Sequence, residues 1–303
     1  MTGSLPPDQW ASVLRWLGWL ALAGVLARPL ALRLMPGEGG GWILGKLLGW
    51  LIVGWVPWCL ATFQILPFDK AAMAGVLVLA LLALRSGLGP RDLRGALTVE
   101  GAFLVLFWLG LAAKLLHPDL TGLEKFTNMG FLSAAMRAEA MPPQDAWFAG
   151  HSLNYYYVGQ AMAGAWGNLA GVTPDHAYPL AMATIFALTA LGAFHITARL
   201  AAPWGQRLAV VLGGFAALLT VYGGNGHSVL YQLFRGWMPT TKAEFYYPDS
   251  TRFIGFDPDT LDKAFTEFPA YGFAAGDLHA HLVATPLFLV AAALVLSILR
   301  RGL

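Results

Sequence analysis

The chain has 303 residues, of which 57% are hydrophobic and 12% are charged, and its mean hydropathy is +0.58. Soluble globular proteins carry about 25% charged residues, so this composition excludes them and makes the lipid bilayer the main solvent. The basic residues behind the net charge of +2 are scattered along the chain, which excludes a nucleic-acid partner. A single cysteine, Cys59, excludes an intrachain disulfide and a cysteine zinc cluster.

Several segments are apolar enough to cross the hydrocarbon of a bilayer, which requires about 20 mostly apolar residues. The N-terminus lacks the basic cluster of a secretory signal, so we expect the first segment to be a retained helix. The third segment is short, and we expect it to be tilted or partly interfacial. Residues 155–172 are rich in Gly, Ala and Tyr, and we interpret them as an interfacial or re-entrant helix. The seven predicted membrane helices are 11–34, 42–66, 71–88, 96–116, 178–199, 204–223 and 279–299.

The orientation follows from Lys and Arg, which are retained in short cytoplasmic loops. Ten basic residues fall on one predicted side, whereas the short segments of the other side hold Arg15 and Lys70. This asymmetry predicts a protein of the cytoplasmic membrane with the N-terminus outside and the C-terminus inside. The ten residues are Arg28, Arg33, Lys46, Arg85, Arg91, Arg94, Arg199, Arg207, Arg300 and Arg301.

The sequence therefore predicts an all-α, polytopic integral membrane protein with two long extracytoplasmic loops. We expect short interfacial helices in these loops. The predicted regions are a four-helix transmembrane region at 1–116, a first outer loop at 117–177, a helix pair at 178–223, a second outer loop at 224–278, and the last helix with a cytoplasmic tail at 279–303.

The polar chemistry is concentrated on the predicted outer side. Fourteen of the seventeen acidic residues fall there, all but Glu38, Asp92 and Glu100, together with every histidine except His195. An active site would therefore face outward. The alternative is that acidic residues only avoid the cytoplasmic face.

The first outer loop contains a carboxylate, an imidazole and aromatic rings within a dozen residues, from Asp145 and Trp147 through His151 to three successive tyrosines at 155–157. This mixture is typical of sugar-binding sites. An aromatic belt at the membrane surface is the alternative. Successive residues on a helix diverge by about 100°, so at most two of the tyrosines could line one site.

The second outer loop ends in an Asp-x-His-x-His string. If a helix begins near Asp277, then Asp277 and His281 share a face and could bind a metal ion, whereas His279 points about 200° away. If the residues before the helix are extended instead, His279 could also face Asp277 and His281. Two alternatives remain open, namely that Asp277 caps the helix or that it acts directly on a substrate.

Three runs carry a family resemblance: EKFTNMGFL at 124–132, PPQDAWFAGHSLNYYYVGQ at 142–160 and TEFPAYGFAAGDLHAHL at 266–282. Together they resemble the "YYY" membrane-protein family, known by its DUF2298 domain. That family is distantly similar to the GT-C glycosyltransferases, which use a lipid-linked sugar and an acidic residue in an outer loop. The resemblance therefore implies a GT-C-like fold and a polyprenyl-phosphate sugar donor.

The resemblance also implies roles for individual residues. Asp145 or Glu124 would be the general base, because an alcohol is a poor nucleophile until its proton is removed. Lys125 and Arg137 would neutralise the leaving phosphate, directly or beside a divalent cation, which is the one cofactor left open. The other implied substrate-binding residues are Trp147, His151, Asn154, Tyr155, Tyr156, Tyr157, Glu267 and His279, and the implied metal ligands are Asp277 and His281.

Two departures from the family pattern favour an alternative function. The first is in the Glu-Lys motif, where Asn128 replaces the Asp of relatives and Phe126 replaces their Pro. The second is that relatives continue with further membrane helices. The alternative is a non-catalytic membrane subunit with an aromatic docking or glycan-binding surface, which a protein partner completes. A transporter ranks last, because the membrane segments contain few ionisable groups.

Overall fold

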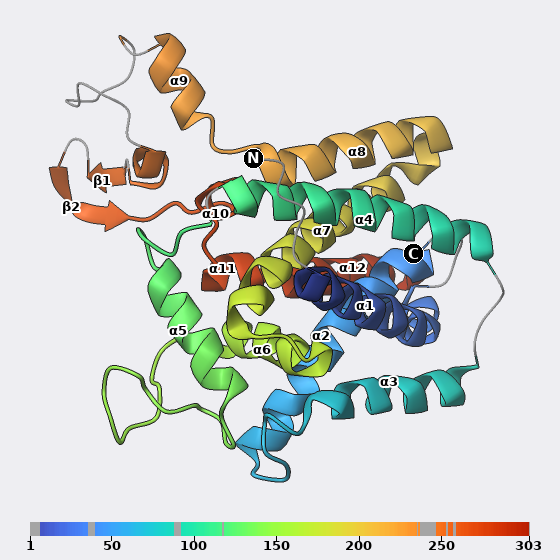
Figure 1. The fold of residues 1–303 in the computed structure, drawn as a ribbon. Helices are drawn as coiled ribbons and strands as arrows, with labels where there is room; N and C mark the ends of the chain where they lie inside the picture. Colours follow the sequence, from blue (N-terminus) through green and yellow to red (C-terminus); the bar gives the residue numbers. More distant parts are fainter. Residues whose placement is uncertain are drawn as a thin grey trace.

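The structure is a computed structural model that describes residues 7–35, 40–87, 92–116, 118–234, 236, 247–252, 254–256 and 259–302. Helices dominate it, and one small antiparallel hairpin lies beside α9 at the edge of the molecule (Figure 1). The elements are α1 Pro7–Leu34, α2 Gly40–Thr62, α3 Ala72–Ser86, α4 Leu93–Leu116, α5 Lys125–Met136, α6 Val158–Ala170, α7 Pro174–Ala201, η1 Ala202–Trp204, α8 Gln206–Tyr222, α9 His227–Phe234, η3 Tyr247–Thr251, β1 Ile254–Phe256, β2 Asp259–Ala264, α10 Pro269–Ala275, α11 Ala280–Val283 and α12 Thr285–Gly302.

The all-α membrane class is confirmed, but the predicted count of seven spans is not. Among the described residues, five helical segments are long and apolar enough to cross a membrane. The other two predicted spans correspond to α3 and α8, which have 15 and 17 residues. A glycine with a positive φ bounds each of these helices: Gly87 follows the end of α3, and Gly205 precedes the start of α8. The five segments are Gln9–Leu34, Gly41–Thr62, Leu93–Leu116, Pro174–Trp204 and Ala280–Arg300.

Three tryptophans hold the centre of the bundle together. Trp16, Trp50 and Trp166 are fully buried, and the rings of Trp50 and Trp166 stack with their centroids 5.2 Å apart. The indole N–H of Trp16 donates to Thr184 Oγ1 at 2.9 Å, and that of Trp166 donates to the Trp50 carbonyl oxygen at 3.1 Å. These rings therefore join α1, α2, α6 and α7 through large apolar faces whose polar atoms are mostly paired.

Helix α6 lies inside the bundle, which argues against the interfacial alternative for residues 155–172 and leaves the re-entrant one as a prediction. It packs against α2, α5 and α7, and its residues 160–167 are all buried. Small residues make this possible, because a Cβ on Gly167 would lie 2.7 Å from Met136 Cε. Close approach through Gly and Ala is typical of helices packed in membranes.

The two ends of the bundle differ in chemistry. Helix α4 runs antiparallel to α7, so its C-terminus, the N-termini of α7 and α12, and the loop with the acidic and histidine motifs share one end (Figure 1). At the opposite end, Arg300 donates to the Arg199 carbonyl and Arg33 to the Arg85 carbonyl. Predicted residues Glu38 and Arg91 lie outside the described residues.

One charged pair lies within the membrane helices. Lys46 Nζ of α2 is 2.6 Å from Glu100 Oε2 of α4, and the Lys46 side chain is buried. The attraction between the two charges offsets part of the desolvation cost that an isolated buried ion would carry. The pair therefore fastens α4 to the N-terminal helices.

Replacing Trp166 with Ala should lower the free energy of unfolding by about 3–5 kcal/mol, because it removes a large ring from a filled core. Melting of the purified protein in detergent measures the effect. Trp204 is 71% exposed on η1 and provides the matched control, since Trp204→Ala leaves no internal cavity. Equal melting temperatures for the two variants would contradict the central role of the three rings.

Candidate functional site

The polar end of the bundle depends on a break in the chain between α10 and α11. Gly276 has a positive φ of 68°, which ends α10, and His279 is extended at φ −74° and ψ 153°. The helix therefore begins at Ala280, three residues after Asp277. The residues before this helix are therefore extended, which was one of the two conformations considered from the sequence. In this conformation the side chains of His279 and His281 point toward each other.

Asp277 does not cap the helix that follows, because His279 is the residue at the N-cap position. Its buried carboxylate instead accepts a hydrogen bond from Asn128 Nδ2 at 2.8 Å, and Asn128 Oδ1 accepts one from Gln160 Nε2 at 2.7 Å. Burial raises the pKa of Asp277 above its ordinary value, and the hydrogen bond from Asn128 opposes that rise. The network thus joins the break to α5 and α6.

The backbone of the break is also hydrogen-bonded inside the protein. The Leu278 N–H donates to the Tyr178 hydroxyl oxygen at 2.8 Å, and that hydroxyl donates to the Gly276 carbonyl oxygen at 3.4 Å. Gln160 Nε2 donates to the Leu278 carbonyl oxygen at 2.9 Å. Side chains from α6 and α7 therefore replace the helical hydrogen bonds that the break removes.

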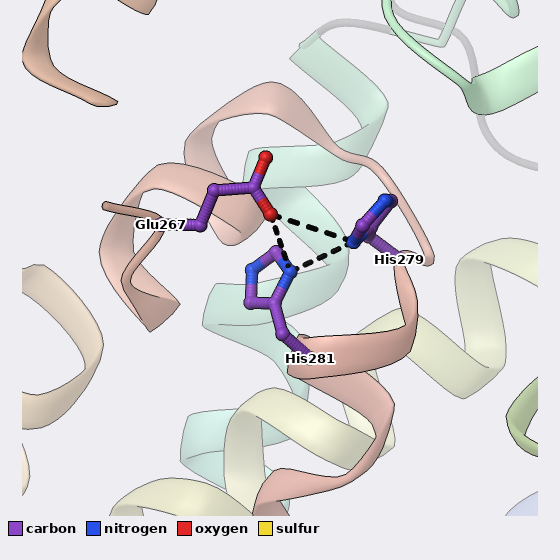
Figure 2. A group of neighbouring side chains, drawn as sticks. All are labelled: Glu267, His279 and His281. Atoms are coloured by element: carbon purple, nitrogen blue, oxygen red, sulfur yellow. Dashed lines mark hydrogen bonds and ion pairs between the residues drawn. The ribbon is translucent and has the colours of Figure 1, made fainter. Parts of the chain in front are cut away.

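Beyond the break, a carboxylate and two imidazoles face one another (Figure 2). Glu267 Oε2 lies 2.8 Å from His281 Nδ1 and 3.5 Å from His279 Nδ1, and the two Nδ1 atoms are 2.8 Å apart. Glu267 lies just before α10, whereas the histidines lie at the start of α11. The group therefore forms because α10 packs against α11. One ligand atom from each residue makes this a candidate metal-binding group, with all three atoms within 4.8 Å of one another.

The first outer loop contributes the other side of the site. The Tyr156 hydroxyl donates to Glu124 Oε2 at 2.8 Å and contacts His279 Nε2 at 2.8 Å, and Glu124 Oε2 lies 3.2 Å from His279 Nε2. Tyr155 donates to the Tyr156 oxygen at 2.7 Å. Burial raises the pKa of Tyr156, as do its bonds to Tyr155 and Glu124. Tyr156 therefore keeps its proton.

These groups surround a small cavity of about 70 Å³. Its volume is that of roughly two water molecules at ~30 Å³ each, so an ion or small group fits and a whole sugar does not. A larger hollow of about 1030 Å³ lies at the opposite, arginine-rich end, where the residues that the structure describes form no comparable group of acids and histidines. The small cavity is lined by Leu123, Glu124, Arg252, Glu267, Tyr271, Gly272, Asp277, His279 and His281.

Four lining residues were absent from the sequence prediction, namely Leu123, Arg252, Tyr271 and Gly272. Arg252 directly follows η3, and its Nη1 lies 3.5 Å from the Tyr271 hydroxyl, with its guanidinium 5.0 Å from the Phe265 ring. Tyr271 and Gly272 lie on α10, inside the run FPAYGFAAGD that carried the resemblance. No motif pointed to Arg252, because it stands in a segment without regular periodicity.

The structure does not bring Asp145 to this cavity. Its Oδ1 accepts hydrogen bonds from the N–H groups of Trp147 at 2.8 Å and Phe148 at 3.1 Å. Trp147 packs edge-on against Phe131, and the His151 ring stacks on Phe148. The carboxylate therefore holds the turn of an exposed aromatic loop.

Other predicted residues are distributed around the site. Arg137 follows the last residue of α5, opposite to Glu124 at its start, and donates to Ser133 Oγ. Lys125 is buried with Nζ 3.5 Å from Asp119 Oδ1. The three tyrosines precede α6 and are not helical, so the limit derived for a helix does not apply to them. Tyr157 is buried and accepts a hydrogen bond from Trp58, whereas Tyr155, Tyr156 and Asn154 are exposed.

Comparison with known proteins gives a family but no activity. The model of a family described as an uncharacterized membrane protein (DUF2298) matches residues 52–302. No curated protein and no solved structure matches the chain.

Asn128→Asp should destabilise the protein by about 2–4 kcal/mol, because it places a second carboxylate against buried Asp277 and removes a charge-assisted hydrogen bond. Thermal melting in detergent at neutral pH measures this loss. The exchange variant Asn128→Asp/Asp277→Asn restores one amide and one carboxylate and should recover most of the stability. If the double variant is no more stable than the single one, the two side chains do not interact as described.

Proposed function

Because this chain belongs to the DUF2298 family of uncharacterized membrane proteins, and because its acids and histidines meet at one end of the membrane bundle, we propose that it is an integral membrane enzyme. The proposed reaction transfers a sugar from a polyprenyl-phosphate donor to an acceptor hydroxyl at the extracytoplasmic face. The proposal rests on one observation: residues from distant parts of the sequence line the same cavity. They are Glu124, Asp277 and the Glu267–His279–His281 group.

Glu124 suits the role of general base. Its carboxylate is 43% exposed, so an acceptor can reach it, while Tyr156 and His279 hold Oε2 in place. In the proposed step the acceptor proton moves to Glu124, the acceptor oxygen bonds to the anomeric carbon, and the bond from that carbon to the phosphate oxygen breaks. The polyprenyl phosphate leaves with the bonding electrons.

Arg252 suits the role that the sequence assigned to Arg137. It lines the same cavity as Glu124, whereas Arg137 lies at the far end of α5. A guanidinium matches phosphate oxygens in a bidentate manner and stabilises the charge that develops on a leaving phosphate. The sugar would lie above the cavity, against the exposed rings of Tyr155 and Tyr156.

The arginine-rich end of the bundle supports the proposed orientation. Arg33, Arg199 and Arg300 gather at the end opposite to the cavity. If basic residues mark the cytoplasmic side, the cavity opens on the outer side, where lipid-linked donors can approach along the membrane surface.

Glu124→Gln should reduce transfer roughly 100- to 10,000-fold, because the amide cannot accept the acceptor proton. Transfer of a labelled sugar from polyprenyl phosphate in membranes containing the full chain measures it. Asp145→Asn is the comparison and should reduce transfer much less, since Asp145 only holds its own loop. An equal loss in both variants would contradict the choice of Glu124, and full activity in both would contradict the reaction.

The exposed aromatic loop favours a second function, that of a docking surface on a non-catalytic subunit. Phe126, Trp147, Phe148 and Tyr155 are 67%, 55%, 62% and 48% exposed and lie close together. Clustered exposed aromatic residues are typical of binding surfaces for proteins or glycans.

Native mass measurement of the gently extracted protein separates the two functions. A stoichiometric protein partner that is lost in the Trp147→Ala/Phe148→Ala variant supports the docking surface. A monomer that carries polyprenyl phosphate and transfers its sugar contradicts it.

A further inference from the structure

We propose that Glu267, His279 and His281 bind one divalent transition-metal ion, and that zinc is the ion their atoms suit best. Imidazole nitrogen with a single carboxylate is a ligand set that favours zinc over the hard cations magnesium and calcium. The inference goes beyond sugar transfer, since metal binding can be measured whether or not the chain is an enzyme. The proposed ligands differ from the pair Asp277 and His281 that the family resemblance implied, because Asp277 accepts a hydrogen bond from Asn128.

The spacing of the three atoms fits such an ion. In a tetrahedral zinc site with bonds of about 2.0–2.1 Å, neighbouring ligand atoms are separated by about 3.3 Å. Glu267 Oε2 and His279 Nδ1 are 3.5 Å apart, while the other two separations are 2.8 Å. Opening the two short contacts by about half an ångström completes the geometry, which small side-chain rotations allow.

The protons of the group also favour a cation. Two imidazole nitrogens 2.8 Å apart require a proton between them, and Glu267 Oε2 competes for that proton at 2.8 Å from His281 Nδ1. When both Nδ1 atoms are unprotonated, each of the three atoms offers a lone pair to an ion between them. A single cation there satisfies the three lone pairs together, which one shared proton cannot do.

His279 has the outer partner that metal-bound histidines require. Its Nδ1 faces the group in Figure 2, while its Nε2 lies 3.2 Å from Glu124 Oε2 and 2.8 Å from the Tyr156 hydroxyl. A carboxylate at the far nitrogen fixes the tautomer and the orientation of the ring. Glu124, His279 and the proposed metal ion would thus form a carboxylate–histidine–metal arrangement.

Three protein ligands leave a fourth position for a small molecule. The group lines the cavity of about 70 Å³, which has room for roughly two water molecules. Zinc sites with three protein ligands and an open position are typical of catalysis, whereas structural sites use four. Arg252 lines the same cavity, so an anionic oxygen, from hydroxide or from a phosphate group, suits the fourth position.

Metal binding to the full chain, purified in detergent and treated with a chelator, tests the proposal. We expect one Zn²⁺ per chain by elemental analysis, and a tetrahedral spectrum when Co²⁺ is added instead. His279→Ala, His281→Ala and Glu267→Gln should each weaken Zn²⁺ binding by more than about 100-fold. Glu124→Gln should weaken it less, by the 10- to 100-fold typical of an outer partner.

His176→Ala is the matched control, because His176 lies on α7 outside the cavity, and it should bind Zn²⁺ like the unaltered chain. Melting without metal identifies variants that fail to fold, and His281→Gln replaces His281→Ala in that case. Zn²⁺ should raise the melting temperature of the unaltered chain and not of the variants of the three ligands. The proposal is wrong if the chain binds no Zn²⁺, or if a folded His279→Ala/His281→Ala variant binds it equally well.

Discussion

The cavity depends on one constraint, namely that a stretch of non-helical backbone at the end of the membrane bundle must have its polar groups paired inside the protein. Residues 276–278 are buried in the protein, so unpaired N–H and carbonyl groups there would cost several kcal/mol each. Tyr178 and Gln160 supply the missing bonds to Gly276 and Leu278. These bonds stabilise the non-helical backbone between α10 and α11.

That break decides which side chains meet. On a continuous helix, His279 and His281 would point about 200° apart, because each residue turns the helix by about 100°. The extended conformation of His279 instead brings the two Nδ1 atoms to 2.8 Å. Beside the same break lies buried Asp277, whose Oδ1 accepts the hydrogen bond from Asn128.

The packing of α6 connects the core to the cavity. Toward its C-terminal end, Trp166 stacks on Trp50. Near its N-terminal end, Gln160 donates to the Leu278 carbonyl oxygen in the break, and the tyrosines directly precede the helix. Its small residues allow this close packing, so a closely packed helix of the core also positions Tyr156 beside Glu124. Stability and the geometry of the cavity therefore depend on the same helix.

The sequence by itself determined the membrane class, the family, the approximate position of the long helices, and three runs that contain Glu124, Tyr156, Glu267 and His279. Such features are encoded locally, in hydropathy over about 20 residues and in short motifs. Only the tertiary structure decided that Asp145 holds its own loop, that Arg252 reaches the cavity, and that α6 is buried. These outcomes rest on contacts between distant residues, such as Asn128 with Asp277 across 149 positions, and packing and long-range hydrogen bonds select them.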